Sequence, residues 1–325
     1  MARLGLHRRE FAGLALATAF AAGRARGGIV RSVHEASRLE SSDTFYVPPT
    51  SLATVADIYR RMTAPVRVMG KGPFPFVVDT GANQSVISAE LAAALHLPRG
   101  EPAMLNGVAG AQMASTTVAA LGLGRRLRRD VTLYVLPADA IGGPGMLGLD
   151  GLEGQRLTLD FRNQRLRIDP AGRLVGDPFA VRVKAQQRDG QLTLVDADLS
   201  GIPITAFIDS GAQNTIGNQA LKSMATLRQI NSPWTSTAVI SVTGQTLDAQ
   251  MAELPNLRLG GMRLPTWPVA FADLHTFQMW NLTETPAILI GVDILSRFEE
   301  VSLDFVHDEV RFRVPNAQEV WVARR

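Results

Sequence analysis

Apolar and polar residues alternate along two long stretches of this chain, and each stretch runs into an acidic residue. The first is VRVMGKGPFPFVVDTGA, residues 66–82, and the second is LTLVDADLSGIPITAFIDSGA, residues 192–212. A period of two predicts β-strands, and the glycines and prolines between the apolar runs predict turns. The pattern therefore predicts two β-hairpins whose last strands end at Asp79 and Asp209.

The residues that follow each acid are also similar, which indicates one unit written twice. Both copies continue with a helix-compatible stretch, a glycine-bearing polar hairpin, an apolar run that meets a glycine, and a closing β-hairpin. These segments are residues 88–97, 105–115, 144–152 and 157–168 in the first copy, and 218–227, 239–249, 287–295 and 301–314 in the second. We therefore expect a mostly β protein with two similar lobes and short helices.

The repeat divides the chain into lobe 1, residues 61–170, and lobe 2, residues 186–325. Residues 171–185 are predicted to be a linker, because prolines and glycines interrupt both periodicities there. Residues 26–60 match neither copy and form an N-terminal extension. The sequence leaves open whether they are a pro-segment, a linker from the membrane or an extra strand.

The first 25 residues have the features of an export signal. Arg8 and Arg9 precede an apolar run from Phe11 to Ala22, which is too short to span a bilayer, and small residues follow. The stretch HRREFAGLAL resembles a twin-arginine signal, with candidate cleavage sites after Ala21 or Ala25. We therefore expect an exported protein, periplasmic or secreted, with membrane tethering if the signal is not cleaved.

Composition and charge exclude several function classes. The 325 residues are 46% hydrophobic and 19% charged, which is typical of a folded chain. The net charge is +3, but residues 1–25 carry four arginines and one glutamate, so the rest of the chain has no basic excess for nucleic-acid binding. The arginines at 125, 126, 128 and 129 are interpreted as a solvated hairpin turn.

The residues needed for several other chemistries are missing or scattered. There is no cysteine, hence no disulfide, thiol nucleophile or thiolate metal site. The five histidines are far apart, and no serine-nucleophile elbow or phosphate-binding loop is found. We therefore expect no metal and no cofactor.

Asp79 and Asp209 are best explained as a pair. An isolated carboxylate among apolar strands is costly to bury unless it is hydrogen-bonded, paired or neutralised. Two carboxyls from related halves solve this by sharing one proton, and the ionised member then activates a water while the protonated member polarises a carbonyl. This chemistry cleaves amide bonds without a metal or a covalent intermediate.

The sequence D-T-G-A at Asp79 and D-S-G-A at Asp209, each followed by an apolar-apolar-glycine run, resembles the retropepsin-like aspartic proteases over roughly residues 61–315. The resemblance implies two closed-barrel lobes with a cleft between them and a catalytic dyad with supporting residues in both loops. It also implies an apolar-glycine element that packs beneath each loop and two flaps that cover the cleft. The residues concerned are Asp79, Thr80, Gly81, Ala82, Asp209, Ser210, Gly211 and Ala212 in the loops; Leu147, Gly148, Ile290 and Gly291 in the apolar-glycine elements; and Gly107, Val108, Gly110, Val242, Thr243 and Gly244 at the flap tips.

Both lobes lie in one chain, so the resemblance implies an aspartic endopeptidase that works as a monomer on peptide or protein substrates. Neither flap candidate contains Tyr or Trp. The alternatives are a catalytically silent peptide- or envelope-component-binding protein that keeps the fold, and a pair of lobes whose acids do not face each other.

The other notable residues have simpler interpretations. Asp150 and Asp293, just after the apolar-glycine runs, are interpreted as N-caps of short helices. Asp160 and Asp304 lie in the closing hairpins and are expected to be exposed or structural. An insertion at residues 271–286 in the second copy is interpreted as a surface loop that holds His275 and Trp280, with contact to substrate as a minority hypothesis.

Overall fold

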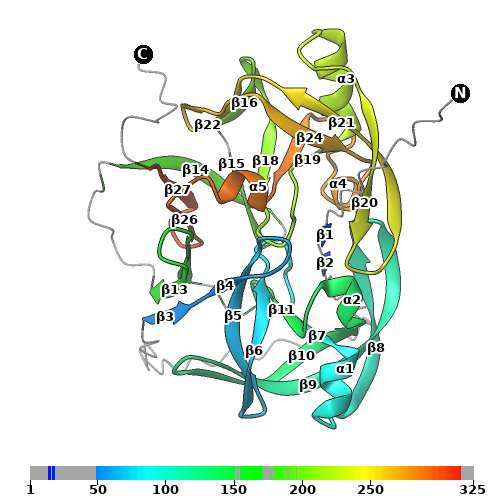
Figure 1. Ribbon diagram of the computed structural model, residues 1–325, viewed down its shortest axis with the longest axis vertical. Helices are drawn as coiled ribbons and strands as arrows, with labels where there is room; N and C mark the ends of the chain where they lie inside the picture. The colour runs from blue at the N-terminus through cyan, green and yellow to red at the C-terminus, as the bar shows by residue number, and fades with distance from the viewer. Residues whose placement is uncertain are drawn as a thin grey trace, which may run out of the picture.

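The computed structural model describes residues 14–15, 17–18 and 49–315, except 151, 153, 171–176, 178, 189 and 195. The described chain is mostly β and forms two similar lobes along the long axis of the molecule, lobe 1 below and lobe 2 above in Figure 1. The predicted fold class is therefore confirmed.

Lobe 1 is built around a sheet whose central strands lead to Asp79. The sheet order is β8-β9-β10-β7-β11-β6-β5-β4, and β5 also pairs with β9, so the strands from β9 to β5 close into a ring. β6 begins exposed and ends buried, so it carries the chain from the surface to the core just before Asp79. The elements of lobe 1 are β4 (Val55–Ala56), β5 (Met62–Val68), β6 (Lys71–Val78), β7 (Val86–Ser88), α1 (Ala89–Ala94), β8 (Arg99–Gly107), β9 (Gly110–Leu123), β10 (Arg126–Leu136), α2 (Ala138–Ile141) and β11 (Gly145–Leu147).

Lobe 2 repeats this arrangement around Asp209. The order β20-β21-β24-β19-β25-β18-β15 corresponds strand by strand to β8-β9-β10-β7-β11-β6-β5, and four short strands form a separate sheet in the order β17-β16-β22-β23. β25 is buried along its whole length because its side chains pack in an apolar cluster on each face of the sheet. The elements of lobe 2 are β15 (Gln191–Leu194), β16 (Ala197–Leu199), β17 (Ile202–Pro203), β18 (Thr205–Ile208), β19 (Ile216–Gly217), α3 (Gln219–Leu227), β20 (Thr235–Ser241), β21 (Thr246–Leu254), β22 (Leu257–Leu259), β23 (Met262–Arg263), β24 (Trp267–Phe271), α4 (His275–Met279), β25 (Ala287–Ile290) and α5 (Val292–Leu295).

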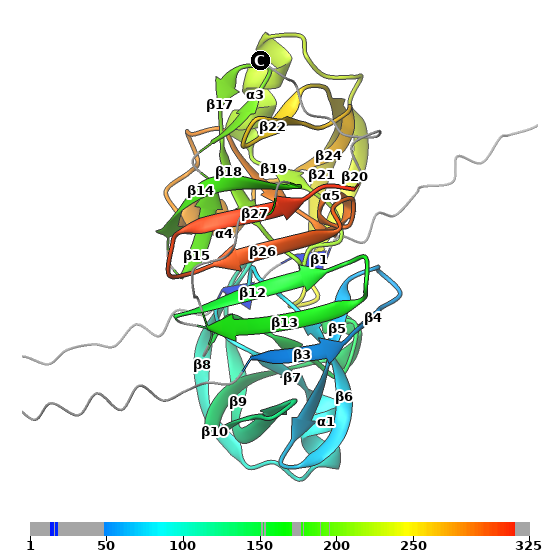
Figure 2. The ribbon, with the colours of Figure 1, turned by 90° about the vertical axis from the view of Figure 1, so that its left-hand side faces the viewer.

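The two closing hairpins pair with each other and join the lobes. Figure 2 shows the joining strands side by side in the order β14-β27-β26-β12-β13-β3. Phe161 and Phe305 lie next to these hairpins and pack against the apolar cores of both lobes. These strands are β3 (Thr50–Ala53), β12 (Gln155–Asp160), β13 (Arg165–Pro170), β14 (Ala180–Arg188), β26 (Glu300–Asp304) and β27 (Glu309–Arg313). We call them the interlobe sheet.

The acids in the closing hairpins are structural. The Asp304 carboxyl is buried and accepts a hydrogen bond from Arg156 Nε at 3.0 Å across the β12–β26 pair. Asp160 is also buried, and it accepts a bond from the backbone N–H of Asn163 at 2.8 Å in the turn after β12. Of the two expectations for these residues, exposure is therefore wrong.

The domain boundaries stay predictions, although the described residues add detail at two of them. β3 pairs with β13, so residues 50–53 of the N-terminal extension form an additional strand of the interlobe sheet. β14 begins at Ala180, inside the predicted linker, while most of residues 171–178 lie outside the described residues.

Helices α1 and α3 begin where side chains cap them. The Ser88 hydroxyl accepts a bond from Leu91 N at 3.0 Å, and the Asn218 side chain accepts one from Leu221 N at 2.9 Å. Each cap satisfies a backbone N–H that has no partner in the first helical turn. None of the helices in the described ranges is long and apolar enough to cross a membrane.

The predicted export signal lies mostly outside the described residues. Two short segments within it are described: β1 (Leu14–Ala15) pairs in parallel with β20, and β2 (Ala17–Thr18) pairs antiparallel with β8. β20 and β8 are the first strands of the two candidate flap hairpins, so their free edges accept an extended segment.

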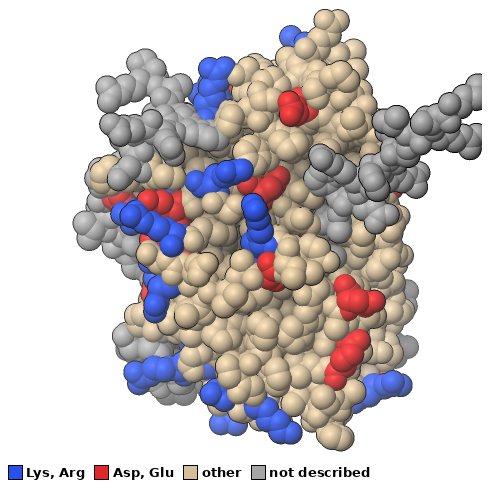
Figure 3. Space-filling view, in the orientation of Figure 1, with Lys and Arg blue, Asp and Glu red and all other residues tan. Residues whose placement is uncertain are grey.

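Charged side chains gather over the interlobe sheet. On the face in Figure 3, Lys and Arg lie beside Asp and Glu on the left, over this sheet, while much of the remaining surface is uncharged. Arg167 pairs with Glu300 at 2.8 Å, and Arg313 lies 3.4 Å from Glu299. In the arginine cluster at the start of β10, Arg128 binds the Asp150 carboxylate at 2.8 Å.

Candidate active site

Asp79 and Asp209 lie at equivalent points of the two lobes and are both buried. Each directly follows the strand that enters its lobe's core, β6 or β18. The backbone N–H of Asp79 donates to Leu147 O at 3.0 Å, and that of Asp209 donates to Ile290 O at 3.0 Å. The apolar-glycine element of each lobe therefore holds the backbone of the acid.

The two carboxyls lie close together at the lobe boundary: the Asp79 carboxyl packs against Gly211, two residues after Asp209, and its charge acts on Asp209. Gly81 N donates to Asp79 Oδ1 at 2.9 Å, while Gly211 N and Ala212 N donate to Asp209 Oδ1 at 2.9 and 3.1 Å. Both Oδ2 atoms are buried, and no N–H or O–H group of the described residues donates to them. The Oδ2 atoms are thus the ones available to share a proton.

The surroundings of the pair favour a single ionised carboxyl. Burial raises the pKa of both acids, and the negative charge of Asp79 adds to burial to raise the pKa of Asp209 well above its ordinary value. Burial is also the largest effect on the pKa of Asp79, which it raises. The Gly81 N–H, the adjacent Asp209 side chain and the Arg61 guanidinium lower the pKa of Asp79 in part. Asp79 is therefore the member that ionises first.

Thr80 and Ser210 connect the two loops by four reciprocal hydrogen bonds. The Thr80 hydroxyl donates to Ile208 O at 2.8 Å and accepts from Ser210 N at 2.9 Å. The Ser210 hydroxyl donates to Val78 O at 2.7 Å and accepts from Thr80 N at 3.1 Å. All of these groups are buried, so a shift of one loop relative to the other breaks several bonds at once.

Gly211 leaves no room for a larger residue. A Cβ atom at this position would lie 2.3 Å from Cγ of Asp79 and 2.5 Å from both of its carboxyl oxygens. The carboxyl of one lobe thus packs directly against the loop backbone of the other, and Ala82 and Ala212 are fully buried beside the loops.

The apolar-glycine elements pack beneath the loops through a set of polar contacts that the sequence interpretation missed. Ser85 Oγ accepts from Gly148 N and donates to Asp150. Thr215 Oγ1 accepts from Gly291 N and donates to Asp293. In both copies a hydroxyl residue lies six positions after the buried acid, and a second acid lies two positions after the glycine of the apolar-glycine element. This shared spacing is the sequence signal for these contacts.

These contacts correct the interpretation of Asp150 and Asp293 as helix N-caps. Asp150 lies in a turn, and its carboxylate binds Ser85 and Arg128. The N-cap of α5 is Gly291; Asp293 lies in the first helical turn, where it accepts bonds from Thr215 and from Trp267 Nε1. Asp150 accepts a bond from the Ser85 hydroxyl, and Asp293 accepts one from the Thr215 hydroxyl, so neither acid serves as an N-cap.

The flap tips cross from one lobe to the other. Val108, at the tip between β8 and β9, packs in an apolar cluster of lobe 2 that includes Ala212 and Phe277. Val242, at the tip between β20 and β21, packs in a cluster of lobe 1 that includes Val77 and Met146. Both valines are fully buried.

The remaining tip residues make close backbone turns. Gly110 and Gly244 have positive φ angles of 139° and 79°, which glycine adopts without strain. Gly107 is tightly packed, since a Cβ there would lie 3.3 Å from the side chains of both Ser241 and Thr243 in the other flap. The two tips therefore contact each other.

The insertion in lobe 2 forms α4 and a turn whose apolar side chains are buried while several polar ones are exposed, so the interpretation of Trp280 as a surface-loop residue is wrong. His275 N, at the start of α4, donates to Val108 O of the lobe 1 flap at 2.7 Å. Trp280 is 4% exposed and stacks on Phe207 with a centroid distance of 4.0 Å. The apolar residues of the insertion fill the space between the flap of lobe 1 and the core of lobe 2.

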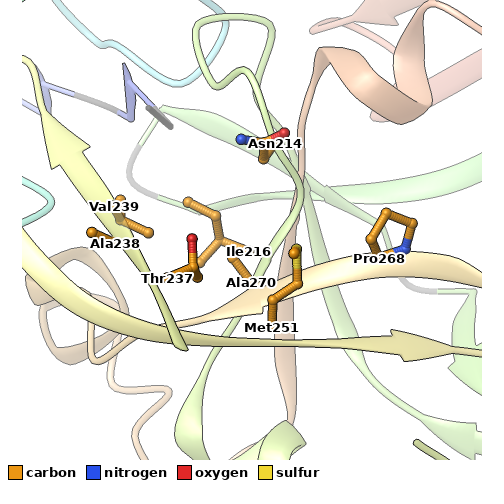
Figure 4. A pocket seen from close by; sticks show the side chains of 8 residues that line it. All are labelled: Asn214, Ile216, Thr237, Ala238, Val239, Met251, Pro268 and Ala270. Atoms are coloured by element: carbon orange, nitrogen blue, oxygen red, sulfur yellow. The ribbon is translucent and has the colours of Figure 1, made fainter. Parts of the chain in front are cut away.

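A small apolar cavity of about 60 Å³ lies beside the loop that carries Asp209 in lobe 2 (Figure 4). Figure 4 shows Asn214 on the loop, Val239 on β20 and Ala270 on β24 around it. Ala270 pairs with Ile216, seven positions after Asp209, and Tyr134 pairs with Val86, seven positions after Asp79. Tyr134 is therefore the residue of lobe 1 that is equivalent to Ala270. Tyr134 is buried and bonds Met104 O at 2.8 Å, so the lobes differ in the space they leave there.

Comparison with known proteins agrees with this geometry. A family model described as aspartyl protease matches residues 64–150 and 195–294, which together make up more than half of the chain. No curated protein matches the sequence. Both matched regions contain one of the buried acids, its loop and its apolar-glycine element. The chain belongs to the aspartyl protease family.

Proposed function

We propose that the protein is an aspartic endopeptidase whose catalytic dyad is Asp79 and Asp209. The observation that carries this proposal is the pair of buried carboxyls, one from each lobe, that act on each other and keep both Oδ2 atoms without a donor. Two isolated buried acids would each need a compensating partner. A shared proton and a bound water satisfy them together, and this is the arrangement that hydrolyses amides.

In this mechanism the ionised Asp79 removes a proton from a water between the carboxyls, and the water oxygen attacks the peptide carbonyl carbon. The protonated Asp209 donates its hydrogen to the carbonyl oxygen, so the tetrahedral intermediate is uncharged at that oxygen. Asp79 then donates its proton to the leaving nitrogen as the C–N bond breaks, while Asp209 takes back the proton of one hydroxyl of the intermediate, so the carbonyl re-forms and the pair is singly protonated again. Thr80, Ser210 and the glycines hold the carboxyls in place throughout.

We further propose that the substrate is an extended peptide that runs between the flaps. The free edges of β8 and β20 support this, because short segments of the chain itself pair with both. An extended peptide adds to such edges by backbone hydrogen bonds, while side-chain pockets determine the preference. The 60 Å³ cavity of lobe 2 is a candidate pocket for a small apolar side chain.

Cellular location and assembly complete the proposal. The twin-arginine-like start supports export, and the presence of both acids in one chain supports a monomeric enzyme. Fusion of residues 1–25 to a reporter that is active only after export would test the location, with Arg8→Lys/Arg9→Lys as the control. Sedimentation of the purified enzyme would test the assembly.

The central test is cleavage of a peptide library from pH 3 to 8 by residues 26–325 and by matched Asp79→Asn and Asp209→Asn variants. We expect activity in the parent at acidic pH and loss of activity in both variants, because neither retains a dyad that shares one proton between two carboxyls. Full activity of either variant would refute a shared site. A parent that binds a non-hydrolysable peptide analogue but cleaves nothing would indicate a binding protein.

A further inference from the structure

The two lobes differ at one position directly beside the dyad. In lobe 1, β5 pairs with β6 so that Thr63 lies opposite Val77, and the same register continued by two residues places Arg61 opposite Asp79. In lobe 2, Thr193 lies opposite Phe207, and continuation places Gln191 opposite Asp209. Residues directly opposite each other on antiparallel strands point to the same face. The equivalent positions opposite the two acids are therefore occupied by a cation in lobe 1 and by a neutral amide in lobe 2.

Arg61 is held in a fixed position. Its side chain is fully buried; Nε donates to Asp57 Oδ2 at 2.7 Å and Nη2 donates to Ile141 O at 3.1 Å. The Asp57 carboxylate also accepts bonds from the backbone N–H groups of Tyr59 and Arg61, so the turn before β5 is built around this ion pair. The guanidinium lies 5.2 Å from the centre of the Tyr59 ring, which supports it from one side.

The ion pair leaves part of the guanidinium available to act on the dyad. Nη1 of Arg61 is buried and makes no hydrogen bond within the described residues. Among the charged groups described, those that act on the Asp79 carboxyl are Asp209 and Arg61, and Arg61 favours its ionised form. Asp57 carries the opposite charge and reduces the effect of Arg61 without removing it, since Arg61 still lowers the pKa of Asp79.

The partner of Asp209 cannot supply a similar charge. Gln191 is buried, and its amide nitrogen donates to Gly81 O in the catalytic loop of lobe 1. It thereby supports the loop that carries Asp79 but adds no charge next to Asp209. The loop hydrogen bonds of the two acids differ by one backbone N–H, whereas the contrast between Arg61 and Gln191 is a difference of one full charge.

We propose that Arg61 is a positioning residue for the dyad: its buried guanidinium, held by Asp57 opposite Asp79, keeps the negative charge of the singly protonated pair on Asp79 and the proton on Asp209. The inference rests on the proposed function for its catalytic consequence. That consequence is a fixed division of roles, with Asp79 as the base and Asp209 as the acid in the attack of water. It also extends activity to lower pH, because the cation favours loss of the first proton.

Two variants of opposite effect test the proposal. Arg61→Gln copies lobe 2 and removes the cation, so the acidic limb of the pH profile of kcat/KM is expected to move up by about one pH unit, at the low end of what an adjacent arginine does to an aspartate. Asp57→Asn removes the counter-charge but keeps the oxygen that accepts from Tyr59 N and Arg61 N. Its acidic limb is expected to move down. Arg61→Lys retains a cation and should keep the limb near that of the parent.

The control is Arg156→Gln, which removes another buried arginine that is paired with an aspartate, Asp304, in the interlobe sheet. It is expected to lower stability as Arg61→Gln does, without moving the acidic limb. The proposal would be overturned if Arg61→Gln and Arg156→Gln both lost stability but the acidic limb of the pH profile did not move in Arg61→Gln. Arg61 would then be a purely structural residue.

A second readout separates this proposal from the proposed function. Carboxyl ¹³C chemical shifts of labelled aspartates, assigned with the Asp79→Asn and Asp209→Asn variants, report which acid ionises first. In the parent the first ionisation is expected at Asp79, and in Arg61→Gln it is expected to be divided between the two acids and to occur at higher pH. An unchanged titration would refute the role of Arg61 even in an active enzyme. The expected change in a protein that cleaves no peptide would uphold it while the peptidase assignment fails.

Discussion

Replacement of Thr80 by valine is expected to destabilise the protein far more than loss of one hydroxyl ordinarily does. Valine keeps the shape of threonine, so packing changes little. The lost hydroxyl binds Ile208 O and Ser210 N, two buried backbone groups of the other lobe. A buried polar group left without a partner costs about 1–3 kcal/mol, so the two together predict about 2–6 kcal/mol of lost unfolding free energy.

The measurement is urea unfolding of Thr80→Val beside a control at a second buried hydroxyl contact between the lobes. Thr158 Oγ1 and Ser302 Oγ lie 2.8 Å apart in the interlobe sheet, and Thr158→Val removes a contact whose remaining partner is a rotatable hydroxyl. That control is expected to cost about 0.5–1.5 kcal/mol. The Thr80 variant should also lose most peptide cleavage, because its loops are no longer held in register.

Equal costs for Thr80→Val and Thr158→Val would refute the reasoning. That result would mean that the backbone groups of the catalytic loops find other partners when the hydroxyl is lost, and that the four reciprocal bonds do not determine the loop geometry. Addition of Ser210→Ala sharpens the test. The two changes act on one network, so their effects are not expected to be additive.

Three further predictions follow from the site and its surroundings. Burial and the charge of Asp79 raise the folded-state pKa of Asp209. As the pH rises above about 4, Asp209 ionises in the unfolded state while the folded state keeps its proton, so the unfolding free energy falls. In urea unfolding, Asp209→Asn should therefore be similar to the parent near pH 3. At pH 7 it should be more stable than the parent by about 1.4 kcal/mol for each unit by which the pKa is raised. An identical pH dependence of the two proteins would contradict this. Gly211→Ala should abolish peptide cleavage because its Cβ meets the Asp79 carboxyl, whereas Gly143→Ala, whose nearest neighbour would be 3.9 Å away, should cleave normally; normal cleavage by Gly211→Ala would show that the loops adjust. Trp280→Ala should cost about 3–5 kcal/mol and speed hydrogen exchange at the lobe 1 flap tip, which α4 holds through Val108; unchanged exchange there would mean that the insertion does not hold the flap.

The sequence by itself determined the β-rich fold and the two similar lobes. Strands and helix starts are local features: alternation identifies β6 and β18, and Ser88 and Asn218 mark the residues before α1 and α3. The repeat of an acid, a hydroxyl residue and a glycine also singled out Asp79 and Asp209 as a pair. The hydrophobic pattern and short-range hydrogen bonding set these features, and both can be seen along the chain.

Contacts between residues far apart in the sequence were decided only by the tertiary structure. Trp280 had been interpreted as a residue of a surface loop, yet Phe207 of the lobe core provides a partner for its ring. Asp150 and Asp293 have the composition of helix caps, but a hydroxyl across the lobe binds each of them. Arg61 carries no local signal at all. Its meaning comes from the strand register that places it opposite Asp79, because electrostatic interaction depends on distance in space and not on separation along the chain.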